Sequence, residues 1–248
     1  MFPLTHVRFC QMLLGDTDSK SILGAVFPDI VITGCLSYNE THFPGWELFD
    51  YILQEHPEEA GLAKSIVTHT VFPEGLDYYG DENYNNGYKG YCFQRGALIV
   101  DKVIAACNIP EEYGLWKAHN FIEMGIELQS IECQPVLVKM LKDAFEDHKA
   151  ICAISNVLSG YYSVDSKVLQ NSFKGFFKFI ELNDINSNSL AEKYNLQMRA
   201  KHGISIDVMK CTGIIEEARN IINNDINMFL DDCMVRVKMM LERRAAYE

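Results

Sequence analysis

Apolar residues recur at every third or fourth position through most of the chain, while strict alternation of apolar and polar residues is rare. The first pattern is typical of helices that bury one face, and the second of half-buried strands. The clearest stripe predicts one long C-terminal helix that begins after Gly213. It consists of Ile215, Ala218, Ile222, Ile226, Phe229, Cys233, Val237 and Met240. The pattern therefore predicts an all-α fold.

Two more amphipathic helices are predicted upstream of this one. The apolar side of the first is formed by Val168, Phe173, Phe176, Phe177 and Ile180. The apolar side of the second is formed by Leu137, Met140, Leu141, Ala144, Phe145 and His148. We expect His148 to close its helix, where an imidazolium suits the negative end of the helix dipole.

Turn-forming residues are concentrated between Phe72 and Gly96, a stretch rich in glycine, proline, asparagine and tyrosine. This composition favours a loop over a regular element. Its aromatic residues, from Tyr78 to Phe93, indicate an ordered loop, and long ordered loops in compact domains are commonly functional. We expect this loop to cover a pocket.

A second polar segment, Asn183–Ser189, is a candidate boundary, but no proline-rich or glycine-serine linker separates two domains. With 48% hydrophobic residues, the chain has enough apolar side chain for a sizeable core. We expect a single all-helical domain over residues 1–248. Residues 1–130 would hold the candidate site, and residues 131–248 would form a helical extension.

The charge balance bears on the class of partner. The chain carries 34 Asp and Glu against 22 Lys and Arg, a formal net charge of −12. Proteins that hold nucleic acid usually present a basic patch, and only Lys238–Arg244 clusters basic residues here, so we expect no stable nucleic-acid partner. No apolar run reaches the roughly 18–20 residues of a membrane span, and a clean signal-peptide core is missing. We therefore expect no transmembrane segment and a cytoplasmic location.

The strongest local pair of metal-ligating residues is His119 and Glu123. Residues four apart on a helix share a face, so this imidazole and carboxylate are expected to converge on one ion. With 34 acids and seven histidines, about one such pair arises by chance. The pair alone is therefore weak evidence, and its context decides its meaning.

Further candidate ligands precede this pair. His6 falls in the first turn of a predicted helix, His42 stands before a helix opened by Pro44, and His69 lies on the buried side of its helix. Asp29 ends an apolar stretch, and a buried carboxylate needs a partner such as a cation. The alternative is that these side chains only cap helices or fill the core.

These residues occur in the motifs TH at His6, GAVFPD at Asp29, THF at His42 and HNFIE at His119 and Glu123, with His69 on a helix between them. In this order they resemble the bacterial zinc-dependent phospholipase C family, whose all-helical fold is shared by fungal single-strand nucleases. The resemblance covers about the first 130 residues. It implies a phospholipase C-like bundle with extra C-terminal helices. It also implies that the chain hydrolyses a phosphoester, either a small molecule or a lipid headgroup.

The resemblance assigns a metal role to each motif. It implies zinc ligands at His6, Asp29, His42, His69, His119 and Glu123. The family's central helix carries His-x-x-x-Asp, but the fourth residue after His69 is Pro73, and the nearest replacements are Glu74 and Asp77. The set implies two zinc ions and leaves ligands for a third incomplete, and other divalent metals stay open.

Zinc accepts imidazole nitrogen and carboxylate oxygen, and two zinc ions activate a shared water for attack on phosphorus. We assign one ion to Asp29, His42, His69 and Asp77. The second is assigned to His119 and Glu123, with Asp77 shared and His6 near either. Asp29 and Glu74 are the predicted catalytic carboxylates, and Glu74 would accept a proton if it is not a ligand.

Other classes of enzyme have less support. The sequence holds no GxSxG, GxxxxGK[ST] or GxGxxG motif, no His-Asp dipeptide and no CxxC pair. His56, His148 and His202 are interpreted as surface or structural residues, with His202 preceding a C-terminal glycine. A second hypothesis is a non-enzymatic helical protein that binds a metal or a partner, in which the C-terminal helices bind the partner.

Overall fold

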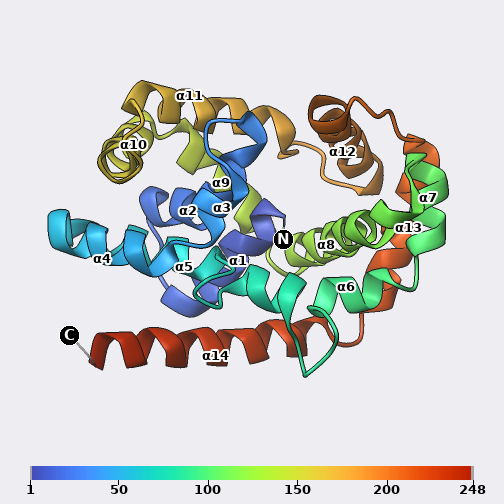
Figure 1. Ribbon diagram of the computed structural model, residues 1–248, viewed down its shortest axis with the longest axis horizontal. Coiled ribbons are helices and arrows are strands. Elements are labelled where there is room, and N and C mark those ends of the chain that lie inside the picture. The colour runs from blue at the N-terminus through green and yellow to red at the C-terminus, as the bar shows by residue number, and fades with distance from the viewer. Residues whose placement is uncertain (1, 247–248) are drawn as a thin grey trace.

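The computed structural model describes residues 2–246, which form helices and connecting turns without a strand (Figure 1). The all-α prediction is confirmed. The α-helices are α1 (Pro3–Leu14), α2 (Ser19–Val26), α3 (Tyr38–His42), α4 (Gly45–Glu55), α5 (Ala60–His69), α6 (Tyr91–Gly96), α7 (Val100–Cys107), α8 (Gly114–Cys133), α9 (Val136–Glu146), α10 (His148–Tyr162), α11 (Ser166–Phe176), α12 (Ser187–His202), α13 (Val208–Ile222) and α14 (Ile226–Ala246). The shorter turns are η1 (Phe27–Thr33), η2 (Pro57–Glu59), η3 (Tyr78–Glu82), η4 (Glu111–Tyr113) and η5 (Phe177–Phe179).

Two hydrophobic cores hold these helices together. The first gathers side chains of α6, α7, α8, α12, α13 and α14 around residues such as Phe121 and Phe229. The second gathers side chains of α2, α4, α5, α9, α10 and α11 around residues such as Leu23 and Phe173. Helix α1 contributes Phe9 to the first core and Leu4 and Val7 to the second. The boundary between the cores therefore runs through the helix that carries His6.

Helices α1 and α8 lie side by side at the centre of the molecule (Figure 1). Glu127 of α8 accepts hydrogen bonds from the backbone N–H groups of Leu4 and Thr5 at 2.9 and 2.8 Å. The Thr5 hydroxyl donates a third, at 2.8 Å. The first N–H groups of a helix have no partner within it, and the residue before α1 supplies no side-chain cap. Glu127 therefore fixes the start of α1, two residues before His6.

The C-terminal prediction was wrong in two respects. Helix α13 begins at Val208, so Gly213 lies inside it, and the apolar stripe is divided between α13 and α14. Between them, Asn223–Asp225 form a turn, and α14 leaves at a large angle to α13 (Figure 1). The carboxylate of Asp225 accepts a hydrogen bond from the Tyr91 hydroxyl at 2.6 Å and pairs with Arg95. Contacts with α6 thus stabilise a turn at a point where the apolar periodicity predicted an unbroken helix.

The helices at 136–162 also depart from expectation at one residue. Helix α9 ends at Glu146, and His148 begins α10 instead of closing α9. Asp147 explains the break, because its carboxylate accepts hydrogen bonds from the N–H groups of Lys149 and Ala150. The helix predicted around Phe173 is confirmed as α11 and η5.

The stretch from Phe72 to Gly96 is more regular than predicted. It contains the π-helical turn η3 and the helix α6, joined by an irregular segment. The polar segment Asn183–Ser189 leads into α12, where the Asn186 side chain caps the helix. Within residues 2–246, the helices are all too short or too polar to cross a bilayer.

Candidate metal centre

A cavity of about 440 Å³ opens between the two cores. Five of the predicted ligands line it: Asp29, His42, Asp77, His119 and Glu123. The remaining two, His6 and His69, are 1% and 0% exposed and approach Asp77 within the same cluster. Side chains from α1, η1, α3, α5 and α8, far apart along the chain, thus meet in one region. Residues of α11 and α12 complete the cavity wall, so the wall extends beyond residues 1–130.

The carboxylate of Asp77 is surrounded by three imidazoles. Its Oδ1 lies 3.3 Å from His6 Nε2, and its Oδ2 lies 3.2 Å from His69 Nε2 and 3.5 Å from His42 Nε2. Among the described residues, the Nε2 atoms of His6 and His69 are buried and form no hydrogen bond of normal geometry. Of the two carboxylates expected to stand in for Pro73, Asp77 is the one that lies among these histidines.

The outer nitrogens of two histidines are oriented by main-chain oxygens. Nδ1 of His69 donates to the Ala25 carbonyl at 2.7 Å, and Nδ1 of His42 lies 3.2 Å from the Tyr38 carbonyl. A carbonyl oxygen only accepts, so Nδ1 of His69 carries a proton and its Nε2 faces the cluster. Metal-binding histidines are held in this way by partners behind them. The Thr41 hydroxyl, 2.8 Å from His42 Nδ1, adds to this support.

Asp29 and His6 extend the cluster on the other side of His69. Asp29 Oδ1 lies 3.9 Å from His69 Nε2, and the rings of His6 and His69 stack with centroids 3.4 Å apart. Potential ligand atoms of His6, Asp29 and His69 lie within 4.8 Å of one another. The same holds for His42, His69 and Asp77, so the two groups share His69.

Burial and charge set the protonation of this cluster. Burial lowers the pKa of His6 to about 3 and also lowers that of His42. Burial also favours the neutral form of His69. The nearby carboxylates of Asp77 and Asp29 have the larger effect, and the pKa of His69 is raised. Burial opposes the charge on Asp77 as well, yet the surrounding histidines hold its pKa well below the ordinary range. The two shifts run in opposite directions, so the charged forms of His69 and Asp77 favour each other.

A second group of potential ligands lies beside the first. Atoms of Asp81, Cys92 and Glu123 fall within 4.8 Å of one another. Burial, followed by the nearby Glu123 charge, raises the pKa of Asp81 well above its usual value, and burial raises that of Glu123 to about 7. Two carboxylates at such close quarters are stabilised by a shared proton or by a cation. The geometry therefore fits a second ion.

The sequence reasoning missed Asp81 and Cys92. Asp81 follows Asp77 by four residues, and η3 turns both side chains toward the cavity. The signal was this Asp-x-x-x-Asp spacing, which was hidden in a stretch expected to lack helical structure. Cys92 had no spacing to mark it, because α6 brings it to Asp81 from eleven residues further along the chain.

His119 and Glu123 form the predicted pair on α8. Nε2 of His119 lies 3.9 Å from Oε1 of Glu123. The His119 ring stacks on Phe93, with centroids 4.3 Å apart, and burial lowers its pKa to about 3. His119 is thus a neutral imidazole at the edge of the second group. The potential ligands closest to Glu123 in that group are Asp81 and Cys92, whereas Asp77 belongs to the group around His69.

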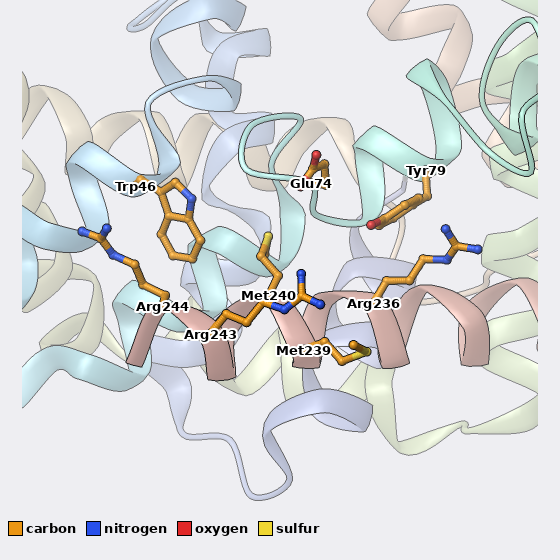
Figure 2. Close-up of a pocket in the computed structure, with 8 residues that line it drawn as sticks. All are labelled: Trp46, Glu74, Tyr79, Arg236, Met239, Met240, Arg243 and Arg244. Atoms are coloured by element: carbon orange, nitrogen blue, oxygen red, sulfur yellow. The ribbon is translucent and has the colours of Figure 1, made fainter. Parts of the chain in front are cut away.

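Glu74 is the one predicted site residue that the structure separates from the others. It is exposed in a different groove, facing α14 together with Trp46 and Tyr79 (Figure 2). A tight turn explains this, because the N–H of Gly75 donates to the carbonyl oxygens of Thr70 and Pro73. The turn directs Glu74 away from the cavity that Asp77 enters three residues later. Glu74 thus lies outside the cavity that holds the other predicted catalytic carboxylate, Asp29.

The other histidines behave as follows. His56 lies near the surface, 4.0 Å from Glu58. His202 ends α12 before the left-handed Gly203, as predicted. It also lines the cavity, where its Nε2 lies 2.9 Å from Nζ of Lys117. Burial lowers the pKa of Lys117 to about 8.

Comparison of the chain with protein-family models, curated proteins and solved structures returns no match. The class of the site is therefore argued from its geometry and donor atoms.

Proposed function

We propose that this chain is a metal-dependent hydrolase of a phosphoester, built around zinc as the resemblance to the phospholipase C family implies. The observation that carries the proposal is the convergence of His42 and His69 Nε2 on Asp77, with each Nδ1 held from behind. If these side chains only filled the core, apolar residues would be more stable there, because burying three imidazoles and a carboxylate carries a desolvation cost.

Two groups of ligands support two ions. The first ion would take His42, His69 and Asp77, with Asp29 and His6 as the next nearest donors. The second would take Asp81, Cys92 and Glu123, with His119 beside them. Imidazole nitrogen, carboxylate oxygen and thiolate sulfur are the donors that zinc prefers.

Bound zinc would supply a water of lowered pKa and a positive charge for phosphoryl oxygens. The chain's own residues provide the rest of the chemistry. Asp29 lines the cavity with its side chain 24% exposed, so it is placed to accept a proton from an attacking water. Tyr38 stacks on His42, with ring centroids 4.0 Å apart, and screens this side of the cluster from solvent.

The size and charge of the site support a small substrate. A volume of about 440 Å³ lies within the range of small-molecule pockets. The net charge of −12 disfavours long polyanions, which gain affinity from extended basic surfaces. A small phosphoester or a detached headgroup is therefore preferred over a nucleic acid.

The test combines metal analysis with turnover. We expect purified protein to contain zinc by elemental analysis and to hydrolyse p-nitrophenyl phosphate or bis(p-nitrophenyl) phosphate. A chelator should abolish turnover, and added zinc should restore it. Asp77→Asn should lose both metal and turnover. Metal-free protein that stays inactive after zinc is added would contradict the proposal.

The second candidate is a non-enzymatic protein in which the cluster is structural. One observation favours it: α14 exposes Met228, Val235 and Met239, which are 66%, 52% and 46% exposed and are suited to contact a partner. In this case zinc would raise the melting temperature, but neither phosphoester would be turned over.

A further inference from the structure

The cavity wall carries two chemically different sets of side chains. Carboxylates and imidazoles of the candidate metal centre form the first set, and Lys117, Lys201 and His202 form a second, basic end, where Lys201 is near enough to Asp29 for their charges to interact. In a protein with 34 acids and 22 basic residues, a cavity wall that gathers cations requires an explanation.

Lys117 is the central residue of this second end. It is 8% exposed, and its Nζ approaches His202 Nε2 at 2.9 Å. Among the described residues, several lysines pair with a carboxylate, such as Lys20 with Glu59 and Lys102 with Glu217, but Lys117 forms no such ion pair. Burying an ammonium group without a carboxylate is costly unless a ligand supplies the negative charge.

Helix polarity explains only part of this arrangement. Lys201 lies in the last turn of α12, where a cation suits the negative end of the helix dipole. Lys117 belongs to the first turn of α8, where a cation is unfavourable on the same principle. Its position therefore points to something that the cavity receives.

A neutral donor adjoins the cations. The Tyr194 hydroxyl accepts a hydrogen bond from the Asn120 side chain at 2.9 Å, which leaves its own hydrogen available to a ligand. Tyr194 is 3% exposed and lines the same cavity. Fixed donors of this kind bind oxyanions together with a nearby ammonium group.

We infer that Lys117, held by His202 Nε2, and the Tyr194 hydroxyl form an anion-binding end of the cavity, which selects a phosphoester that carries a second negatively charged group. The identity of the first group as a phosphoryl rests on the proposed function. The second group is a carboxylate or a phosphate that would contact Lys117. A cationic headgroup such as phosphocholine is disfavoured, because its ammonium would face Lys117.

The first experiment tests the anion-binding end without metal. Inorganic phosphate is titrated into metal-free protein by calorimetry for the wild type, Lys117→Met, Lys117→Arg and the control Lys102→Met. Lys102 is exposed and pairs with Glu217, so its removal should not change phosphate affinity. We expect Lys117→Met to weaken binding at least tenfold and Lys117→Arg to retain most of it. Equal affinity in the wild type and Lys117→Met would overturn the inference.

The second experiment tests selection in zinc-loaded protein. Methylphosphonate and phosphonoacetate share the phosphonate group, but only the second carries a carboxylate. We expect phosphonoacetate to bind about tenfold more tightly, and this gain to vanish in Lys117→Met and persist in Lys102→Met. Equal affinity of the wild type for the two compounds would overturn the inference. Bis-anionic ligands with a second phosphate in place of the carboxylate then identify the preferred group.

The two proposals fail separately. Lys117-dependent phosphate binding in a protein that shows no zinc-dependent turnover would refute the hydrolase and leave the anion-binding end standing. Zinc-dependent turnover with phosphate affinity that is independent of Lys117 would refute the anion-binding end alone. Circular dichroism melting of each variant shows whether it has folded, and Lys117→Arg provides the folded comparison if Lys117→Met is unstable.

Discussion

The carboxylate of Glu127 accepts two hydrogen bonds from Thr5, one from its backbone N–H and one from its hydroxyl, both at 2.8 Å. This contact joins the start of α1 to the middle of α8. His6 follows Thr5 directly, and Glu123 precedes Glu127 by one helical turn. The two helices that carry these candidate ligands are therefore positioned by one buried carboxylate.

Glu127→Ala should destabilise the protein by about 2–3 kcal/mol, because buried N–H groups of α1 lose their acceptor. Urea denaturation measures the change. Glu132→Ala on the same helix is the control, since this exposed residue pairs only with Arg219 at the surface and should cost less than about 1 kcal/mol. Equal stability of Glu127→Ala and the wild type would show that α1 is positioned by other contacts.

His69→Ala should lose the bound metal, because His69 belongs to both groups of potential ligands on this side of the cavity. Elemental analysis of the folded variant gives the metal content. His56→Ala, which changes a histidine near the surface, should keep the wild-type stoichiometry. An unchanged stoichiometry in His69→Ala would remove His69 from the centre.

Zinc affinity should rise with pH through about 7, because the Glu123 carboxyl, whose pKa is raised to about 7, must lose its proton to bind an ion. Calorimetric titration of zinc between about pH 5.5 and pH 8 follows this change, because this range lies on both sides of the raised pKa of Glu123. In Glu123→Gln, the affinity should be lower and its rise with pH smaller. An identical pH profile in the variant would assign the proton to another group.

The same shift predicts how metal-free stability depends on pH. In the folded state the pKa of Glu123 is about 7, above its usual 4.5, so the folded protein holds the proton more tightly than the unfolded chain. The contribution of Glu123 is therefore complete below pH 4.5 and is lost as the pH rises through 7. Relative to Glu123→Gln, the wild type should lose about 2–3 kcal/mol over this interval, since one pKa unit is worth about 1.4 kcal/mol.

Glu74→Gln should leave metal content and turnover unchanged, because Glu74 lies in the groove beneath α14 and outside the cavity (Figure 2). Asp77→Asn is the matched substitution, since it removes one negative charge three residues away and should abolish both. Turnover of p-nitrophenyl phosphate compares the two variants. Loss of turnover in Glu74→Gln would return this carboxylate to the site.

Asp225→Ala should destabilise the turn between α13 and α14 by about 1–2 kcal/mol, because the Tyr91 hydroxyl and Arg95 lose their acceptor. Thermal melting measures the effect. Asp232→Ala breaks a more exposed pair with Arg236 within α14 and should be close to neutral. A neutral Asp225→Ala would mean that the polar turn at Asn223 and Asn224 is sufficient to break the helix.

The all-α architecture was predictable because a helix buries one face, and this requirement places apolar residues at regular spacing in the sequence. The same logic placed His69 on the buried side of α5 and His119 one turn from Glu123 on α8. The gathering of most candidate ligands in one region agrees with the expectation, since most of them stand in short motifs at elements whose local structure is set by nearby residues.

Tertiary structure decided what local spacing does not encode. Asp81 reaches Glu123, and Lys117 reaches His202, across gaps of 42 and 85 residues, so only the packing of η3, α8 and α12 brings them together. The turn at Asp225 depends on α6, and the direction of Glu74 depends on a tight turn of the backbone. Periodicity records which face of a helix is buried, whereas the position of one helix against another depends on contacts between distant residues.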